Sequence, residues 1–346
     1  MKVIKSFYKL ILLFALIIST LLSLNIFGVE FIHPYMFLRY EYKKTYQGIK
    51  YYEDIVPIKG GIAVIYRGRI GIISSGDSIT WNRVAYQNHR AYSDGEIAVA
   101  WVQGGRYLHI ISSKDQKDIL YPANIEKVRV KNGKVLVLLS GKSEDYLIMY
   151  DRNQNIIFSV KYKEKVIDCD FNGTFAVAIL KPRDSNQIAI SLADKRGIYM
   201  TKLLSANLQS ARRCYAIEDN ILLYNQKRLE VFDSKLKTRI NAFEFSAPPE
   251  YAMGNPNILL AKNKVLVYSK LRKSFVLKQI EEFDWMCADA EKIVTSRGNE
   301  IRIYSLNLNR LKTLRVNSSG FVKAVINRDR LYYIYNDRIK LYQERW

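Results

Sequence analysis

The chain has 346 residues, 49% of them hydrophobic, which is enough apolar material for one large domain or two ordinary ones. Its 54 basic and 33 acidic residues give a formal net charge of +21, so its surface attracts polyanions, unless the excess charge provides only solubility. The three cysteines, Cys169, Cys214 and Cys287, include no CxxC pair, which argues against a disulfide framework or a zinc site and predicts buried free thiols.

Residues 10–29 form an uncharged apolar run, LILLFALIISTLLSLNIFGV, between Lys9 and Glu30. As a helix it spans about 30 Å, the thickness of one hydrocarbon core, and it predicts one transmembrane helix. Residues 1–9 are then a short basic cytoplasmic flank and residues 30–41 a juxtamembrane segment. A cleaved signal peptide is the alternative, but no Ala-x-Ala site follows the run. The expected location is the plasma membrane, single-pass, with the amino terminus cytoplasmic and the body extracytoplasmic.

A strand-like pattern returns eight times along residues 42–346, at spacings of 36 to 42 residues. Its first copies are RIGIISSG at 69 and YLHIISSK at 107, and its last is RIKLYQER at 338. The aligned apolar positions are Ile70, Leu108, Leu147, Ala189, Leu229, Val265, Ile301 and Ile339. A period of about 40 residues is typical of repeat architectures, so this regularity sets the fold.

Each copy follows another β-branched strand, and a turn signal precedes most of these pairs. The strongest signals are Gly60-Gly61, Asp94-Gly95, Asn132-Gly133 and Asn172-Gly173, which favour the positive φ angles of tight hairpins. Four antiparallel strands in each repeat predict an all-β fold, a single β-propeller of eight four-stranded blades, with seven as the alternative. The last repeat lacks a fourth strand, so we expect the amino-terminal strand of residues 42–346 to complete it and close the ring.

The segment GGIAVIYRGRIGIISSGDSITWNRVAYQNHRAYSDGEIAVAW carries a resemblance to a family. It resembles an uncharacterised family of N-terminally membrane-anchored, propeller-like proteins of Gram-positive anaerobic bacteria, over roughly residues 50 to 120. In broad outline the chain is also similar to the quinoprotein-like and WD-repeat-like propeller superfamily, without their signature motifs. The resemblance implies a fold and a location, and no activity.

The sequence carries no Walker loop, no G-x-S-x-G elbow and no dinucleotide-binding fingerprint. His33, His89 and His109 are the only histidines, and no two stand at a metal-ligand spacing, so we expect no metal and no cofactor. The run DCDFNG at 168 opens like a calcium loop, but Ile179 stands where the twelfth-position glutamate would be. It is interpreted as a hairpin corner. Carboxylates near the channel could still converge across blades, and the candidates are Asp54, Asp168, Asp170 and Asp284.

A basic residue recurs in the connection between the second and third strands of every repeat. Radial repetition would turn this periodicity into a positively charged face, opposite hairpins that carry Asp94, Asp219, Asp289, Glu291 and Asp329. A solvated surface without function is the alternative. The candidate face for an anionic partner comprises Arg67, Arg69, Arg106, Lys142, Lys181, Arg183, Lys227, Arg228, Lys262, Lys264, Arg297 and Arg338.

Two functions from different classes follow. The first is a non-enzymatic binding or scaffold module, anchored in the membrane, whose basic face engages an anionic wall polymer, the membrane surface or an acidic protein. Because the expected location is extracytoplasmic, we expect no nucleic-acid partner. The alternative is an anchored enzyme, a glycan hydrolase or lyase or a quinone-dependent dehydrogenase, with its active site in the channel; it rests on fold analogy alone. The sequence does not indicate an oligomeric state.

Overall fold

The computed structural model describes residues 38–345 except 67, 75–78, 85–88, 183–184 and 318. Residues 42–343 form one compact unit. The predicted transmembrane segment, residues 10–29, lies outside the described residues. Among the residues that are described, no helix is both long and apolar enough to cross a membrane.

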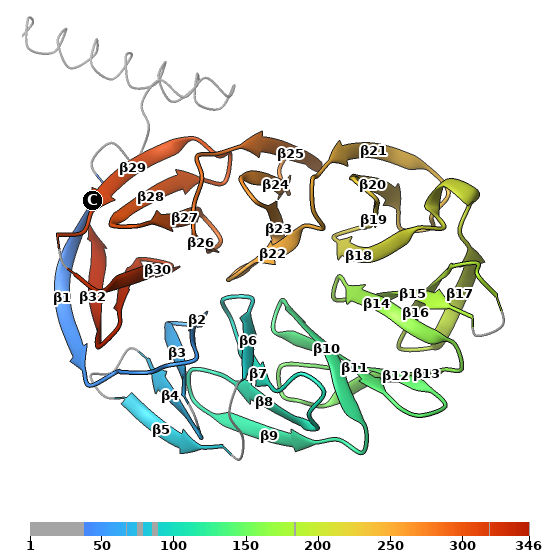
Figure 1. The fold of residues 1–346 in the computed structure, drawn as a ribbon, viewed down its shortest axis with the longest axis horizontal. Helices are drawn as coiled ribbons and strands as arrows, with labels where there is room; N and C mark the ends of the chain where they lie inside the picture. Colours follow the sequence, from blue (N-terminus) through green and yellow to red (C-terminus); the bar gives the residue numbers. More distant parts are fainter. Residues whose placement is uncertain are drawn as a thin grey trace, which may run out of the picture. The chain divides into compact units, whose positions relative to one another are not determined.

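The regular secondary structure of the described residues is β, apart from one short 3-10 helix, η1 (Ala206–Leu208). Eight antiparallel sheets of four strands confirm the prediction of an eight-bladed propeller. In the compact unit, the sheets follow one another around a ring in chain order (Figure 1).

We number the blades from the first complete sheet. Blade 1 comprises β2 (Asp54–Ile58), β3 (Gly61–Tyr66), β4 (Arg69–Ile73) and β5 (Ile79–Arg83). Blade 2 comprises β6 (Arg90–Ser93), β7 (Ala98–Trp101), β8 (Tyr107–Ile111) and β9 (Gln116–Leu120). Blade 3 comprises β10 (Asn124–Lys131), β11 (Lys134–Ser140), β12 (Asp145–Tyr150) and β13 (Ile156–Tyr162). Blade 4 comprises β14 (Lys165–Phe171), β15 (Ala176–Lys181), β16 (Ala189–Asp194) and β17 (Gly197–Leu203).

The second half of the ring repeats the plan. Blade 5 comprises β18 (Ala211–Ile217), β19 (Asn220–Asn225), β20 (Arg228–Asp233) and β21 (Arg239–Glu244). Blade 6 comprises β22 (Glu250–Ala252), β23 (Asn255–Ala261), β24 (Lys264–Ser269) and β25 (Ser274–Gln279). Blade 7 comprises β26 (Trp285–Ala288), β27 (Lys292–Arg297), β28 (Glu300–Ser305) and β29 (Arg310–Arg315). Blade 8 comprises β30 (Phe321–Asn327), β31 (Arg330–Tyr335), β32 (Arg338–Arg345) and β1 (Arg39–Gln47), which supplies the strand that the last repeat lacks.

The hydrophobic core lies between neighbouring blades. One cluster joins blades 3 and 4 through residues such as Leu138, Phe158 and Phe171, and a second joins blades 4 and 5 through Ile190 and Leu223. The middle strands of a blade are covered on both faces and are therefore continuously apolar, as in β3, where all six residues are buried. The three cysteines are free and buried in these layers, as predicted.

The corners between first and second strands have the backbone that the turn signals require. The φ angles are +52° at Asn132 and +70° at Gly133, while Gly60, Gly95 and Gly173 also have positive φ. Blade 6 turns at a corner without such a dipeptide, Met253-Gly254, after a first strand of only three residues.

That corner of blade 6 reaches across the ring and binds blade 2. The backbone N–H of Gly254 donates to the carbonyl of Ser93 in blade 2 at 2.9 Å, and Ala288 N–H of blade 7 donates to the Met253 carbonyl at 2.8 Å. A Cβ on Gly254 would lie 2.2 Å from the Ala288 oxygen, so only glycine permits the contact. Figure 1 shows β22 directed across the ring toward β6 and β10.

Candidate functional site

The turns between second and third strands emerge on one face of the ring, because every blade has the same antiparallel order and chain direction. We call it the 2–3 face, and we call the opposite one the 1–2 face. Arg67 and Arg183 lie outside the described residues. The exposed members of the predicted set on this face are Arg69, Arg106, Lys142, Lys181, Lys227, Arg228, Lys262 and Arg297; Lys264 and Arg338 are half-buried.

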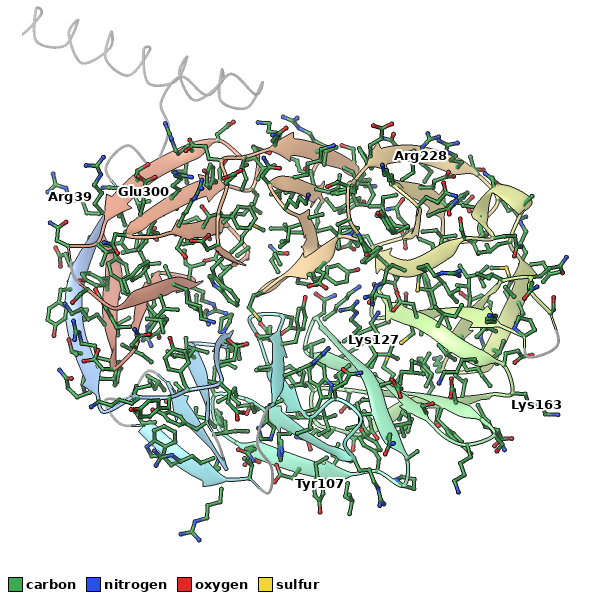
Figure 2. All side chains as sticks on the ribbon, viewed as in Figure 1. Arg39, Tyr107, Lys127, Lys163, Arg228 and Glu300 are labelled. Atoms are coloured by element: carbon green, nitrogen blue, oxygen red, sulfur yellow. The ribbon has the colours of Figure 1, made fainter. Side chains whose placement is uncertain are left out.

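Most of these cations have no carboxylate partner among the described residues. The exceptions are Arg297, which pairs with Glu282 at 2.8 Å, and Arg338, which pairs with Asp337 at 3.0 Å. Two others bind backbone carbonyls: Arg106 Nε donates to Tyr121 at 2.7 Å and Lys264 Nζ to Glu244 at 3.0 Å. In Figure 2, Arg228 lies at the outer edge of the ring and Lys127 lies in its interior. The free cations are thus spread around the 2–3 face and are not gathered in one pocket.

Arg69 forms an aromatic stack at this face. Its guanidinium lies 4.3 Å from the Trp81 ring centroid and 4.9 Å from that of Tyr66. Gly71 makes room for the indole, because a Cβ there would lie 2.6 Å from the Trp81 ring. Trp81 is 37% exposed, so part of an aromatic surface beside a cation faces solvent.

The electrical contrast between the two faces is weaker than the hairpins alone suggest. Turns between third and fourth strands also emerge on the 1–2 face, and they carry exposed cations that the sequence argument did not count. These are Lys114, Arg152, Lys195, Arg196, Lys235, Lys237, Lys270, Arg272 and Lys273. Net charge alone therefore does not single out the 2–3 face, and any test of it needs a control on the other side.

A cavity of about 710 Å³ opens where the first strands of blades 1 to 6 begin, on the 2–3 side of the ring. It contains both signs of charge. Lys127 pairs with Asp168, whose other oxygen accepts the Cys214 N–H at 2.9 Å, and Arg213 lies 3.6 Å from the same carboxylate.

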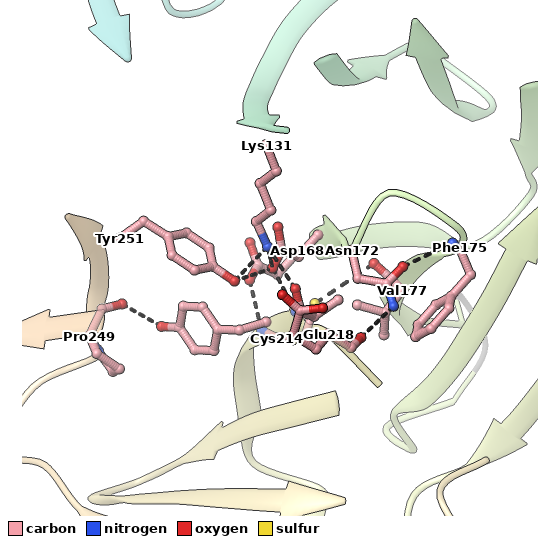
Figure 3. Close-up of polar contacts among 12 residues, drawn as sticks. Lys131, Asp168, Asn172, Phe175, Val177, Cys214, Glu218, Pro249 and Tyr251 are labelled. Atoms are coloured by element: carbon pink, nitrogen blue, oxygen red, sulfur yellow. Dashed lines mark hydrogen bonds and ion pairs between the residues drawn. The ribbon is translucent and has the colours of Figure 1, made fainter. Parts of the chain in front are cut away.

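Deeper in the ring, Lys131 and Asp170 form a buried ion pair with an N–O distance of 2.5 Å. Figure 3 shows Lys131 directed toward Tyr251. Lys131 Nζ also donates to Tyr251 Oη at 2.6 Å and to the Ala216 carbonyl at 2.9 Å. Asp170 Oδ2 accepts from Tyr251 Oη at 2.6 Å and from Ala216 N–H at 2.7 Å. Burial lowers the pKa of Lys131 to about 8, although Asp170 opposes this shift. The network joins blades 3, 4, 5 and 6.

Arg129 lies beside the network and lines the cavity. Its Nε is buried without a hydrogen-bond partner among the described residues, and its guanidinium lies 5.7 Å from the Tyr251 ring centroid. Burial opposes its charge, but Asp170 and Asp168 raise its pKa above the usual value. It stays cationic, with no carboxylate bound directly to it among the described residues.

The carboxylates proposed as a channel centre do not converge on one point. Asp54 pairs with Lys323 at 2.7 Å, while Asp168 and Asp170 pair with Lys127 and Lys131 respectively. Asp284 accepts the Gly298 N–H at 3.3 Å. No group of three or more metal-ligand side chains occurs within the described ranges.

The three polar side chains of DCDFNG each have a partner other than a metal. Asp168 and Asp170 bind the lysines of blade 3, and Asn172 Oδ1 accepts the Thr174 and Phe175 N–H groups at 3.0 and 3.1 Å. Asn172 Nδ2 donates to the Glu218 carbonyl of the next blade. The motif is a hairpin corner tied to its neighbour.

The structure brings together two histidines that sequence spacing did not pair. His89 and His109 lie in blade 2 with their ring centroids 5.2 Å apart. His89 Nδ1 lies 3.1 Å from Glu53 Oε2, and His109 Nδ1 lies 2.8 Å from Asp118 Oδ1. The Nε2 atoms of both rings are buried without a partner among the described residues.

Comparisons with known proteins agree on the fold. Neither protein-family models nor curated proteins give a match. Among solved structures, the chain is similar to BamB from Moraxella catarrhalis, at 10% identity and a TM-score of 0.50, over 88% of this chain and 97% of that one. It is similar to the Dos1 propeller at 10% identity and a TM-score of 0.51, over 88% and 95% of the two chains.

A third similarity is to PorZ of Porphyromonas gingivalis, described as an essential bacterial surface component of the type-IX secretion system. The identity is 12% and the TM-score 0.52, over 84% of this chain and 42% of that one. At such identities the shared property is the propeller fold, and the function has to be argued from the surface.

Proposed function

We propose that this protein is a membrane-anchored, extracytoplasmic propeller that acts as a non-enzymatic binding module, with the 2–3 face as its binding surface. The partner is an extended anionic polymer, such as a phosphate-bearing wall polymer. The observation that carries the proposal is the set of exposed cations on the 2–3 turns that have no carboxylate partner among the described residues. They recur in successive blades, so one long polyanion can contact several of them together.

The chemistry of these cations supports a polymer more than a small ligand. Lys142, Lys181, Lys227 and Lys262 are exposed on separate turns, and such ammonium groups are flexible point charges suited to phosphates in variable positions. The exposed Trp81 beside Arg69 adds a surface on which a sugar or polyol backbone can pack. Each contact at such an exposed site is weak, so affinity arises from their number and falls as salt rises.

Charge reversal on the two faces tests the proposal. The 2–3 variant replaces Lys142, Lys181, Lys227 and Arg228 by Glu. The control replaces Lys114, Lys195, Lys235 and Lys273 of the 1–2 face by Glu, so both variants undergo the same change in net charge. Binding of poly(glycerol phosphate) to the full chain in detergent is measured at low and high salt, and thermal stability is measured beside it.

We expect the 2–3 variant to lose at least tenfold in affinity, and the control to change by no more than about threefold, with similar melting temperatures. Equal losses in the two variants would mean that net charge alone attracts the polymer, and the proposed face would be wrong. If the wild type binds an acidic protein or anionic vesicles through this face but not the polymer, the polymer is the wrong partner.

A further inference from the structure

His89 and His109 form a pair with an unusual set of contacts. His109 lies on β8 directly opposite Asp118 of β9, so the sheet register holds the carboxylate against the ring. His89 lies just before β6, where Glu53 binds both its backbone N–H, at 2.9 Å, and its Nδ1, at 3.1 Å. Each imidazole is thus oriented by a carboxylate at Nδ1.

This arrangement decides which nitrogen is available. A carboxylate at Nδ1 holds the proton there, which leaves Nε2 with a free lone pair in the neutral ring. Both Nε2 atoms are buried, yet neither has a hydrogen-bond partner among the described residues. Buried polar atoms are nearly always satisfied, so two such nitrogens in neighbouring rings require an explanation.

The spacing of the rings fits a shared ion. With metal–nitrogen bonds of about 2.0–2.1 Å at a tetrahedral angle, two imidazoles on one ion have their centroids roughly 5 Å apart. The observed separation is 5.2 Å. Histidines that bind metals usually donate the other ring N–H to a carboxylate, and both Glu53 and Asp118 are placed to accept it.

A cavity of about 450 Å³ adjoins the two histidines. Both histidines line it, together with Gln103, Tyr107 and Asn124. Arg106 also lines it, but its Nε is bound to the Tyr121 carbonyl. The two carboxylates bring negative charge close to the rings, which favours a divalent cation.

We propose that His89 and His109 bind a late first-row divalent transition-metal ion through their Nε2 atoms, with solvent completing the coordination. Imidazole nitrogen suits Zn²⁺, Cu²⁺ and Ni²⁺, whereas Mg²⁺ and Ca²⁺ prefer oxygen ligands. An ion held by two side chains keeps open coordination positions, so we expect it to be exchangeable. The proposal does not depend on the function assigned to the 2–3 face.

The test uses the full chain in detergent, purified without a polyhistidine tag and freed of metal with a chelator. Zn²⁺ binding is measured by calorimetry, and Cu²⁺ is added as a spectroscopic probe. We expect one ion per chain and an electron paramagnetic resonance spectrum with hyperfine splitting from two nitrogens. H89Q/H109Q should bind at least tenfold more weakly, whereas H33Q, the only other histidine variant, should match the wild type.

Asp118→Asn keeps both histidines and should weaken Zn²⁺ binding about 10-fold to 100-fold, as changes behind a metal ligand do. It also remains informative if the double variant fails to fold. Equal binding by the folded wild type and H89Q/H109Q would overturn the proposal. So would a Cu²⁺ spectrum without nitrogen splitting, or loss of binding in H33Q.

Discussion

The buried pair between Lys131 and Asp170 gives the sharpest stability prediction. Both side chains are almost fully buried, and they share Tyr251 Oη and the Ala216 peptide groups as partners. Asp170→Asn keeps an acceptor for Tyr251 and Ala216 but leaves the Lys131 cation unpaired. Lys131→Met leaves the Asp170 anion with only its two neutral donors.

Removing one member of a buried ion pair is expected to lower the free energy of unfolding by about 3–5 kcal/mol. The double variant D170N/K131M contains neither buried charge, so its loss should be no larger than that of either single variant. The implied coupling free energy is at least about 3 kcal/mol, at the upper end of the range for residues in one buried network.

Equilibrium denaturation of the full chain, followed by tryptophan fluorescence, measures these differences. The matched control is the exposed pair between Arg196 and Asp194, which are 2.6 Å apart. Arg196→Gln should leave stability almost unchanged, because exposed pairs contribute little. If the two single variants each lost less than about 1 kcal/mol, or if their losses were additive in the double variant, the network would not hold the blades together as argued.

Two further predictions concern the same region. Gly254→Ala should lower the free energy of unfolding by at least about 2 kcal/mol, because the new Cβ would lie 2.2 Å from the Ala288 oxygen at a φ of +86°. The control is Gly197→Ala, which has a φ of +102° but open space around it and should lose only about 1 kcal/mol. Equal losses in the two variants would contradict the tight contact at Gly254. The free energy of unfolding of the wild type, relative to that of Lys131→Met, should rise by about 1–2 kcal/mol from about pH 8 to about pH 9.5. The reason is that the lowered pKa of Lys131 in the folded protein makes the unfolded chain bind more protons in this range. Parallel pH profiles of the two proteins in denaturant titrations would refute the prediction.

The repeat made the ring predictable from sequence, because each blade builds its strands from local patterns. The spacing of Ile70, Leu108 and their counterparts marked the third strand of each blade, and Asn132-Gly133 and its equivalents marked the corners. Both signals depend on a few adjacent residues.

Contacts between blades were not predictable in this way. Lys131 and Asp170 are 39 residues apart, and Tyr251 lies 81 residues beyond Asp170. Their meeting depends on how far the corner of blade 6 crosses the ring, which no local pattern encodes. His89 and His109 belong to one blade, but their pairing follows from the strand register of His109 with Asp118 and from the loop before β6. A search of the sequence for a carboxylate opposite a histidine on the next strand could have found the contact between His109 and Asp118, but not the position of His89.

The backbone contact across the ring bears on the two functions that the sequence left open. An enzyme with a channel centre needs free acid and base groups around an accessible cavity. Here Asp168 and Asp170 are held by lysines of blade 3, and Gly254 joins the backbone of blade 2 across the ring. Access is then left to the mouths of the channel and to the blade surfaces. On the 2–3 side the mouth contains Arg129, a cation without a carboxylate bound to it among the described residues, inside the circle of exposed turn cations. Under the proposed function, we expect a polyanion bound along those turns to place a negative group at Arg129, which would join the mouth and the rim in one binding surface.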